Sequence, residues 1–296
     1  MITKHLASLG TDMQKPISGS DARDRAAYIR LASIPWPIQR LFWQVVIGVL
    51  FLLGWEYLPR IHFISSNVRF LDAFFISSPS EVWSSLVGIV TGHNQNGITL
   101  WPYLWTTLKA TLIGTSAGLL AGALFGLVSS NNLRLSEVVR PYLILANSVP
   151  RVAIIPIFVV MMGPTVGASV VSVIAVVFFI AFFNAFEGGV SIREALIENA
   201  ILLGARPFDV MRVIRLPMVL IWTFASIPNA ISFGLVVAVT TELIAGIAGM
   251  GQLILNATAN VQVALTFAII VALSIVGLLL YGMAMAVRAK IVRWKA

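Results

Sequence analysis

The chain contains no cysteine, which excludes a disulfide framework, a thiolate metal site and a thiol nucleophile. It has only three histidines, His5, His62 and His93, and their spacing does not match a metal-binding cluster. No glycine-lysine pair occurs, although a phosphate-binding P-loop needs one within G-x-x-x-x-G-K-[ST]. The sequence therefore predicts no metal site and no ATP hydrolysis by this chain.

Charged residues are also scarce, at 11% of the 296 residues, whereas hydrophobic residues make up 58%. Soluble globular chains are about one quarter charged. A water-soluble fold with so few charges would expose large apolar patches. The net charge of +8 would suggest nucleic acid in a soluble protein. In a membrane protein the distribution of the basic residues instead indicates which loops lie inside the cell. We therefore expect no nucleic-acid partner.

Six stretches are apolar enough to cross a membrane as helices of roughly 20 residues. They are 41–58, 104–128, 138–162, 166–186, 219–245 and 265–287. Spanning strands would alternate and need only about 10 residues, so we predict an all-α membrane protein with six transmembrane helices. Residues 1–40 are polar and form a predicted cytoplasmic tail, because the first apolar run starts too late for a cleaved signal peptide. Residues 41–296 form the transmembrane domain.

Basic residues set the predicted orientation. If the N-terminus is cytoplasmic, most of the lysines and arginines lie inside, and only Arg60 and Arg69 lie clearly outside. The positive-inside rule then places both termini in the cytoplasm. Lys109 lies near the outer end of the second span, where its side chain can reach the interface.

A capping box in the outer loop, Ser78-Pro79-Ser80-Glu81, marks the start of a helix with proline in its first turn. Apolar residues follow at helical spacing, so we predict a short amphipathic helix on the outer membrane surface. Such a helix either only packs against the spans or also makes a functional contact.

The segment between the fourth and fifth spans, at about 188–217, is patterned as two short helices and is called the coupling segment below. One helix covers 192–203, and Gly204 follows where a helix end favours a left-handed residue. Pro207 suits the first turn of the second helix, which is predicted to end at Pro217. Several apolar side chains indicate a surface that contacts a partner: Leu202, Leu203, Phe208 and Met211.

This segment resembles the EAA signature of ABC importer permeases, which reads E-A-A, three residues, G, nine residues, I-x-L-P. The matching residues are Glu198-Asn199-Ala200, Gly204 and Ile214-Arg215-Leu216-Pro217. The chain departs from the pattern at Asn199, where the signature has alanine, and at Arg206, where a small polar residue is common.

Other parts of the chain are similar to the nitrate/sulfonate/taurine branch of that family. They are Ser78-Pro79-Ser80-Glu81-Val82, Pro150, Pro156, and Glu242 with Gly249-Met250-Gly251. The resemblance covers roughly residues 40–290. It implies the type I ABC importer permease fold and a location in the bacterial inner membrane.

The resemblance also implies partners and roles. Two permease chains, expected to be a homodimer, surround the pathway within the membrane lipid. Two separate ATPase subunits bind ATP-Mg, so this chain needs no cofactor, and a periplasmic or lipid-anchored binding protein delivers the substrate. The residues expected to couple to the ATPase are Glu198, Ala200, Gly204, Ile214, Leu216 and Pro217. Glu198 would pair either with a basic residue of the ATPase or with an arginine of its own segment.

Polar residues at membrane depth usually face a pathway or another helix. Arg151 lies near Asn147, about midway along the third predicted span. It would either attract an anionic substrate, or pair with a carboxylate or helix carbonyls, or reach cytoplasmic water. Both residues are pathway candidates.

The fifth predicted span carries the other pathway candidates. At about 100° per residue, Asn229, Ser232 and Thr240 fall within roughly 80° of one another and predict a polar stripe along the pathway. Glu242 falls about 80° beyond Ser232, so it faces either the pathway or another helix.

Glycines in the second predicted span, Gly118, Gly122 and Gly126, recur every four residues. This spacing predicts a helix-packing face within the chain rather than at a dimer seam. The similar run Gly246–Gly251 superficially matches a dinucleotide fingerprint. It has no preceding strand, and we interpret it as a tight turn at the outer face.

Two other classes of protein are compatible with a polytopic membrane chain. An ion-coupled secondary transporter would have acidic residues in mid-span and inverted repeats, and neither is evident. An intramembrane enzyme would need a metal-spaced cluster or a nucleophile with a base. The branch favours a small anion as substrate (sulfonate, taurine, nitrate or carboxylate type), and uptake of a vitamin precursor is the alternative.

Overall fold

The structure is a computed structural model of the chain and describes residues 36–57, 59, 76–93 and 97–291. The chain divides into two units between Asn67 and Val68. In the first unit, α3 (Trp36–Tyr57) is an apolar helix of 22 residues. At about 1.5 Å per residue this length is sufficient to cross the hydrocarbon core of a bilayer. The predicted tail lies outside the described residues except for 36–40, which form the start of α3.

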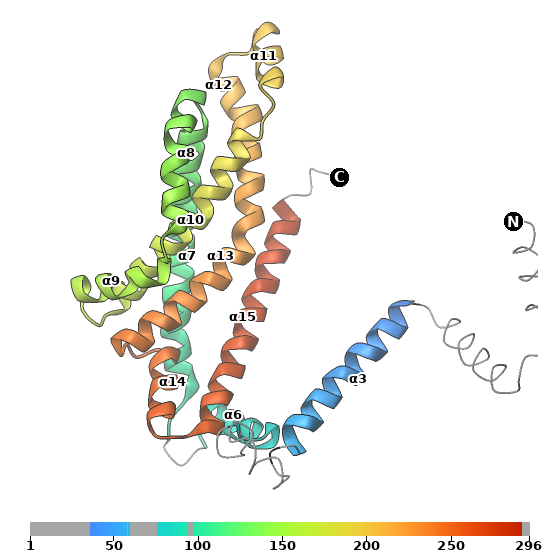
Figure 1. Cartoon of the computed structure of the whole chain (residues 1–296), viewed down its shortest axis with the longest axis vertical. Coiled ribbons are helices and arrows are strands. Elements are labelled where there is room, and N and C mark those ends of the chain that lie inside the picture. Colours follow the sequence, from blue (N-terminus) through green and yellow to red (C-terminus); the bar gives the residue numbers. More distant parts are fainter. Residues whose placement is uncertain (1–35, 58, 60–75, 94–96, 292–296) are drawn as a thin grey trace, which may run out of the picture. The chain divides into compact units, whose positions relative to one another are not determined.

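The second unit is helical throughout its described elements (Figure 1). Its α-helices are α6 (Pro79–Thr91), α7 (Leu100–Ser130), α8 (Leu133–Ser148), α9 (Ile155–Met162), α10 (Val166–Val190), α11 (Glu194–Leu202), α12 (Pro207–Val210), α13 (Leu216–Ala245), α14 (Met250–Ala259) and α15 (Val263–Ile291). A 3-10 turn, η4 (Arg151–Ile154), precedes α9, and a π-helical turn, η5 (Met211–Arg215), precedes α13.

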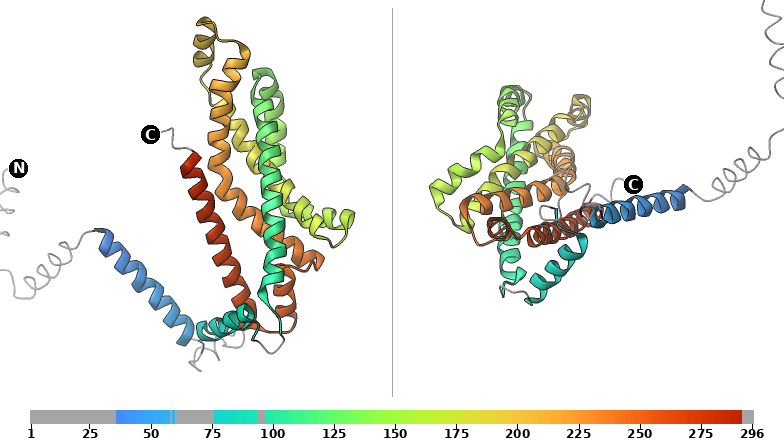
Figure 2. Two further views of the ribbon diagram at one scale, coloured as in Figure 1. Left: turned by 180° about the vertical axis from the view of Figure 1, so that it is seen from behind. Right: turned by 60° about the horizontal axis from the view of Figure 1, so that its bottom comes forward.

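The long helices of this unit connect two ends (Figures 1 and 2). One holds α11 and α12 and is called the α11 end. The other holds α6 and α14 and is called the α14 end. Helix α10 packs against both α7 and α13, and its buried residues Val173, Val177 and Ala181 form the centre of the unit.

Five of the described helices are long and apolar enough to span a membrane, and a bent pair makes a sixth span if its two parts cross the membrane together. The pair divides the predicted span 138–162 into two parts, because the chain turns by 80° between α8 and the η4–α9 segment. Pro150 explains the break. A proline disfavours helical geometry in the residue before it, and Val149 is accordingly extended, with ψ 127°.

Small residues allow α7 and α10 to approach closely. A Cβ atom at Gly122 would lie 2.5 Å from the carbonyl oxygen of Phe178 and 2.7 Å from the Cβ of Ala181. Gly118 is similarly close to Val177, and Gly126 is similarly close to Ala185. The prediction that these glycines form a packing face within the chain is confirmed.

The prediction that a helix begins after Ser78 is also confirmed. Ser78 is the N-cap of α6, and its hydroxyl accepts a hydrogen bond from the Glu81 N–H at 3.4 Å. Helix α6 buries Leu86 and Ile89 and packs against α15 and α7. The indole N–H of Trp101 donates to the Val90 carbonyl at 3.2 Å, which ties the end of α6 to the first turn of α7.

Candidate functional site

The coupling segment contains a well-formed helix end at Gly204. The N–H of Ala205 donates to the Ala200 carbonyl and that of Gly204 to the Ile201 carbonyl, both at 2.9 Å. These two bonds, with φ +89° at Gly204, define a Schellman motif. The turn needs a residue that adopts a left-handed conformation, as the sequence predicts. A Cβ atom at Gly204 would meet nothing within 4 Å, so its space within this chain is open.

Apolar side chains on both sides of this turn are exposed. Leu202 is 84% exposed, Leu203 89% and Phe208 69%, whereas a solvated loop would gain nothing from them. Glu198 is exposed too and forms no ion pair with another described residue. The coupling segment thus presents an apolar surface beside an acidic side chain, which is typical of a docking site for another protein.

The second part of the coupling segment differs from its prediction. Helix α12 does not end at Pro217 but continues through the π-helical turn η5 into α13. Pro217 follows directly after η5, where the rod changes from π-helical to α-helical geometry, and it supplies no N–H to the helix at this point. Ile214 and Leu216 therefore belong to one continuous rod that runs from the α11 end into the fifth span.

Arg215 fastens this rod to α7. Its Nη1 donates to the carbonyl oxygen of Ser130, the last residue of α7, at 2.7 Å. A cation suits this position because the last carbonyls of a helix lack partners and carry partial negative charge. A cavity of about 180 Å³ adjoins the contact and is lined by Ser136 and Glu194 among others. The coupling segment is thus connected directly to α7.

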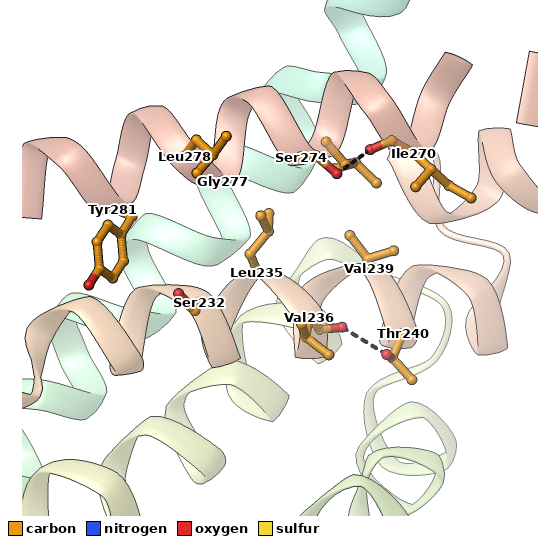
Figure 3. Close-up of a pocket in the computed structure, with 11 residues that line it drawn as sticks. Ser232, Leu235, Val236, Val239, Thr240, Ile270, Ser274, Gly277, Leu278 and Tyr281 are labelled. Atoms are coloured by element: carbon orange, nitrogen blue, oxygen red, sulfur yellow. Dashed lines mark hydrogen bonds between the residues drawn. The ribbon is translucent and has the colours of Figure 1, made fainter. Parts of the chain in front are cut away.

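The intramembrane polar candidates do not gather in one place. Ser232 and Thr240 of α13 line a groove of about 470 Å³ between α13 and α15, together with Ser274 and Tyr281 of α15 (Figure 3). The hydroxyls of Ser232, Thr240 and Ser274 donate to carbonyls of their own helices. Asn229 is exposed but is not among the groove residues.

Arg151 lies in η4, directly after the bend and near the middle of the third predicted span. Asn147 is part of α8, and its side chain lies outside the described residues. Glu242 is fully buried and faces α7 and α14 rather than the groove. The polar residues of the fifth span therefore separate into a groove set, Ser232 and Thr240, and a buried carboxyl group.

Two features of the site are not among the predictions. Helix α14 follows the predicted turn at Gly246–Gly251 and shares only its first two residues with it, and Leu253 and Ala257 of this helix recur at helical spacing and are buried. The contact of Arg215 with Ser130 joins residues 85 positions apart, and arginine occupies the variable position of the I-x-L-P pattern, so no local signal marks it.

These features define a class of protein: a polytopic α-helical membrane protein with an exposed apolar surface on one end. The family described as "Binding-protein-dependent transport system inner membrane component" matches residues 114–293. The chain belongs to this family. It is a permease subunit of an ABC transporter and a multi-pass protein of the inner membrane.

Individual relatives agree with this assignment. The chain is 27% identical over 162 residues to the riboflavin transport system permease protein RibX of Chloroflexus aurantiacus, covering 55% of this chain and 60% of that one. It is 29% identical to a probable ABC transporter permease protein of Haemophilus influenzae, over 53% of this chain and 66% of that one. These two matches thus span less than two thirds of the relatives' length.

A longer match has lower identity. The taurine transport system permease protein TauC of Escherichia coli is 22% identical over 88% of this chain and 92% of its own length. Among solved structures, a chain of the MetNI methionine ABC transporter in inward-facing conformations has the same fold. Its TM-score is 0.54 at 19% identity, and the match covers 72% of this chain and 98% of that one.

Proposed function

We propose that this chain forms part of the substrate pathway of an ABC importer and transmits the action of a separate ATPase through the coupling segment. One observation carries the proposal: the exposed apolar surface of Leu202, Leu203 and Phe208 beside the rigid turn at Gly204. The continuous rod from α12 into α13, with Arg215 bound to α7, gives a docked partner a direct mechanical connection to the spans.

Besides this chain, the expected assembly contains at least four subunits. Two ATPase subunits bind ATP-Mg and dock on the coupling segments of two permease chains, which we infer to be copies of this one. A substrate-binding protein docks on the opposite face, in keeping with the family's description as binding-protein-dependent. Family membership leaves no support for the ion-coupled secondary transporter.

Co-purification tests the coupling proposal. The tagged chain, extracted in mild detergent from its own cells, is expected to bring a stoichiometric ATPase subunit, identified by mass spectrometry. Leu203→Glu, which places a charge on the exposed apolar surface, should release the ATPase, since desolvating an unpaired charge is costly. Val261→Glu, in the exposed turn between α14 and α15, is a matched control at 57% exposure and should retain it, because this turn lies outside the spanning helices and away from the coupling segment. Purification of the chain alone would overturn the proposal.

The orientation follows from the same assembly. The coupling segment must meet a cytoplasmic ATPase, so the α11 end faces the cytoplasm and the α14 end faces the periplasm. The many basic residues near the α11 end, among them Arg193, Arg206 and Arg212, support this orientation through the positive-inside rule. A reporter that works only in the cytoplasm should be active when it is fused after Ala296, and a reporter that works only in the periplasm should be inactive there. Activity of the periplasmic reporter would reverse the orientation.

The proposed substrate is a small organic or inorganic anion, of the sulfonate, taurine, nitrate or carboxylate type. The similarity to TauC over most of the chain supports it, and Arg151 at the bend between α8 and α9 supplies a half-buried positive charge. The similarity to RibX supports the alternative, a vitamin or its precursor, and the uncharged groove between α13 and α15 is compatible with such a molecule.

Arg151→Gln separates these substrates. The complete transporter, with its own binding protein, is assayed for uptake of radiolabelled taurine and of radiolabelled riboflavin. For an anion, loss of the positive charge should lower taurine uptake about tenfold, equivalent to one charge-assisted hydrogen bond. Arg151→Lys keeps the charge and should retain most of the uptake. Uptake of riboflavin but not taurine, unaffected by Arg151→Gln, would overturn the anion assignment.

A further inference from the structure

Glu242 is fully buried at the α14 end of α13, although it carries an ionisable carboxyl group. Its Oε2 accepts a hydrogen bond from Thr107 Oγ1 of α7 at 2.8 Å and another from the Gly251 N–H of α14 at 3.0 Å. Thr107 Oγ1 in turn accepts the Met250 N–H at 2.9 Å. Three helices therefore meet at one carboxyl oxygen and one hydroxyl.

The two backbone donors are the first two N–H groups of α14. The first N–H groups of a helix have no partner within the helix and are usually capped by a nearby side chain of the same segment. Gly249, the N-cap residue of α14, has no side chain to do so. Glu242 and Thr107 cap α14 from two other helices, so the cap also holds α14 in place.

The glycines beside the cap make this arrangement possible. A Cβ atom at Gly249 would overlap the carboxyl group of Glu242, and one at Gly251 would overlap the carbonyl oxygen of Val239. The pattern Gly249-Met250-Gly251 thus lets the backbone of α14 approach Glu242 closely enough for the hydrogen bonds.

The arrangement uses only one of the two carboxyl oxygens. Both donors reach Oε2, whereas Oε1 has no hydrogen-bond partner in the described part of the chain. An amide oxygen has two lone pairs and can accept both bonds equally well. The geometry therefore requires an acceptor at residue 242 but not a second oxygen.

We infer that Glu242 and Thr107 are positioning residues that hold α14 in place by accepting hydrogen bonds from its first two N–H groups. They thereby fix the spacing of α13 and α15. Helix α14 is the direct connection between α13 and α15 and packs against both. Those two helices line the groove that holds Ser232 and Thr240. The consequence for transport rests on the proposed function, whereas the fastening itself does not.

Spin-label distances test the fastening without any substrate. Because the chain has no cysteine, labels attach only where cysteines are introduced. Leu120→Cys with Asn256→Cys reports the position of α14 relative to α7, and Phe233→Cys with Met283→Cys reports the spacing of α13 and α15. All four side chains are exposed. The full chain is measured in lipid nanodiscs.

Four variants are compared in each labelled background. Glu242→Gln and Thr107→Ser keep the required groups and should retain the narrow distance distributions of the parent. Glu242→Ala and Thr107→Val remove them and should broaden or shift both distributions. An unchanged Leu120–Asn256 distribution in Glu242→Ala overturns the fastening, and so does a Glu242→Gln variant that behaves like Glu242→Ala. A shift of that pair alone overturns the effect on α13 and α15.

The complex with the co-purified ATPase adds a functional measurement. The α11 end is unaltered in these variants, so Glu242→Ala should retain basal ATP hydrolysis within about twofold while uptake falls about tenfold or more, the loss expected for buried groups left unpaired. Equal loss of both activities would indicate general misfolding and overturn the positioning role. If no ATPase co-purifies, the proposed function fails, and the distance measurements still decide the fastening.

Discussion

Gly122→Leu is expected to prevent stable assembly of the helices in the second unit. A Cβ atom at this position would already lie 2.5 Å from a backbone oxygen of α10, and backbone cannot move aside as a flexible side chain does. The variant must separate α7 from α10, whose contact forms the centre of the unit. Overpacking of this kind costs about 3 kcal/mol or more, so the apparent Tm should fall by roughly 10 °C or the protein should not be recovered as a single species.

The measurement is the thermal stability of the detergent-purified chain, followed by size-exclusion chromatography. Gly282→Leu is the matched control, since it makes the same change within a long apolar helix, where a Cβ atom meets nothing within 4 Å. It should leave the apparent Tm unchanged. Equal stability of the two variants would contradict the role of the glycine face in packing α7 against α10.

The features that the sequence predicted correctly are local ones. Ser78 and Glu81 are three residues apart, and their hydrogen bond follows from the conformation of a few residues. The left-handed turn at Gly204 is likewise encoded within about six residues. The length and apolarity of the spans reflect the thickness of the bilayer, which acts on each helix separately.

The features that depend on tertiary contacts were not predictable in this way. Thr107 and Glu242 are 135 residues apart, so helical periodicity could place Glu242 away from the polar stripe but could not name its partner. The groove likewise depends on α15, whose Ser274 and Tyr281 are distant in sequence from Ser232 and Thr240. Only the packing of α7, α13, α14 and α15 brings these groups together.

Prolines gave ambiguous signals because their effect depends on position. Pro150 breaks the third predicted span, whereas Pro217 lies within the continuous rod, directly after its π-helical turn. Both prolines lack an N–H, but only Pro150 is preceded by a residue in extended rather than helical geometry. The sequence alone did not distinguish these cases, because the π-helical turn that carries α12 into α13 has no local signature.

Gly204→Arg is expected to abolish binding of the ATPase, and with it transport, while leaving the chain inserted and folded. Holding a non-glycine residue at φ +89° costs about 1–2 kcal/mol, which is too little to unfold a bundle whose contacts lie elsewhere. The open space around Gly204 excludes a clash within the chain. The damage is therefore confined to the angle between α11 and α12 and to the apolar surface of Leu202, Leu203 and Phe208.

The measurement is ATPase co-purification together with thermal stability of the variant chain. Gly204→Asn is the matched control, because asparagine adopts left-handed conformations more readily than other residues with a side chain. It should keep most of the bound ATPase, whereas Gly204→Arg should lose it at nearly unchanged Tm. Full binding by the arginine variant would show that the left-handed turn is dispensable for coupling. Equal loss in both variants would show instead that the partner requires the absence of any side chain at residue 204, and that the surface, rather than the turn, is what it recognises.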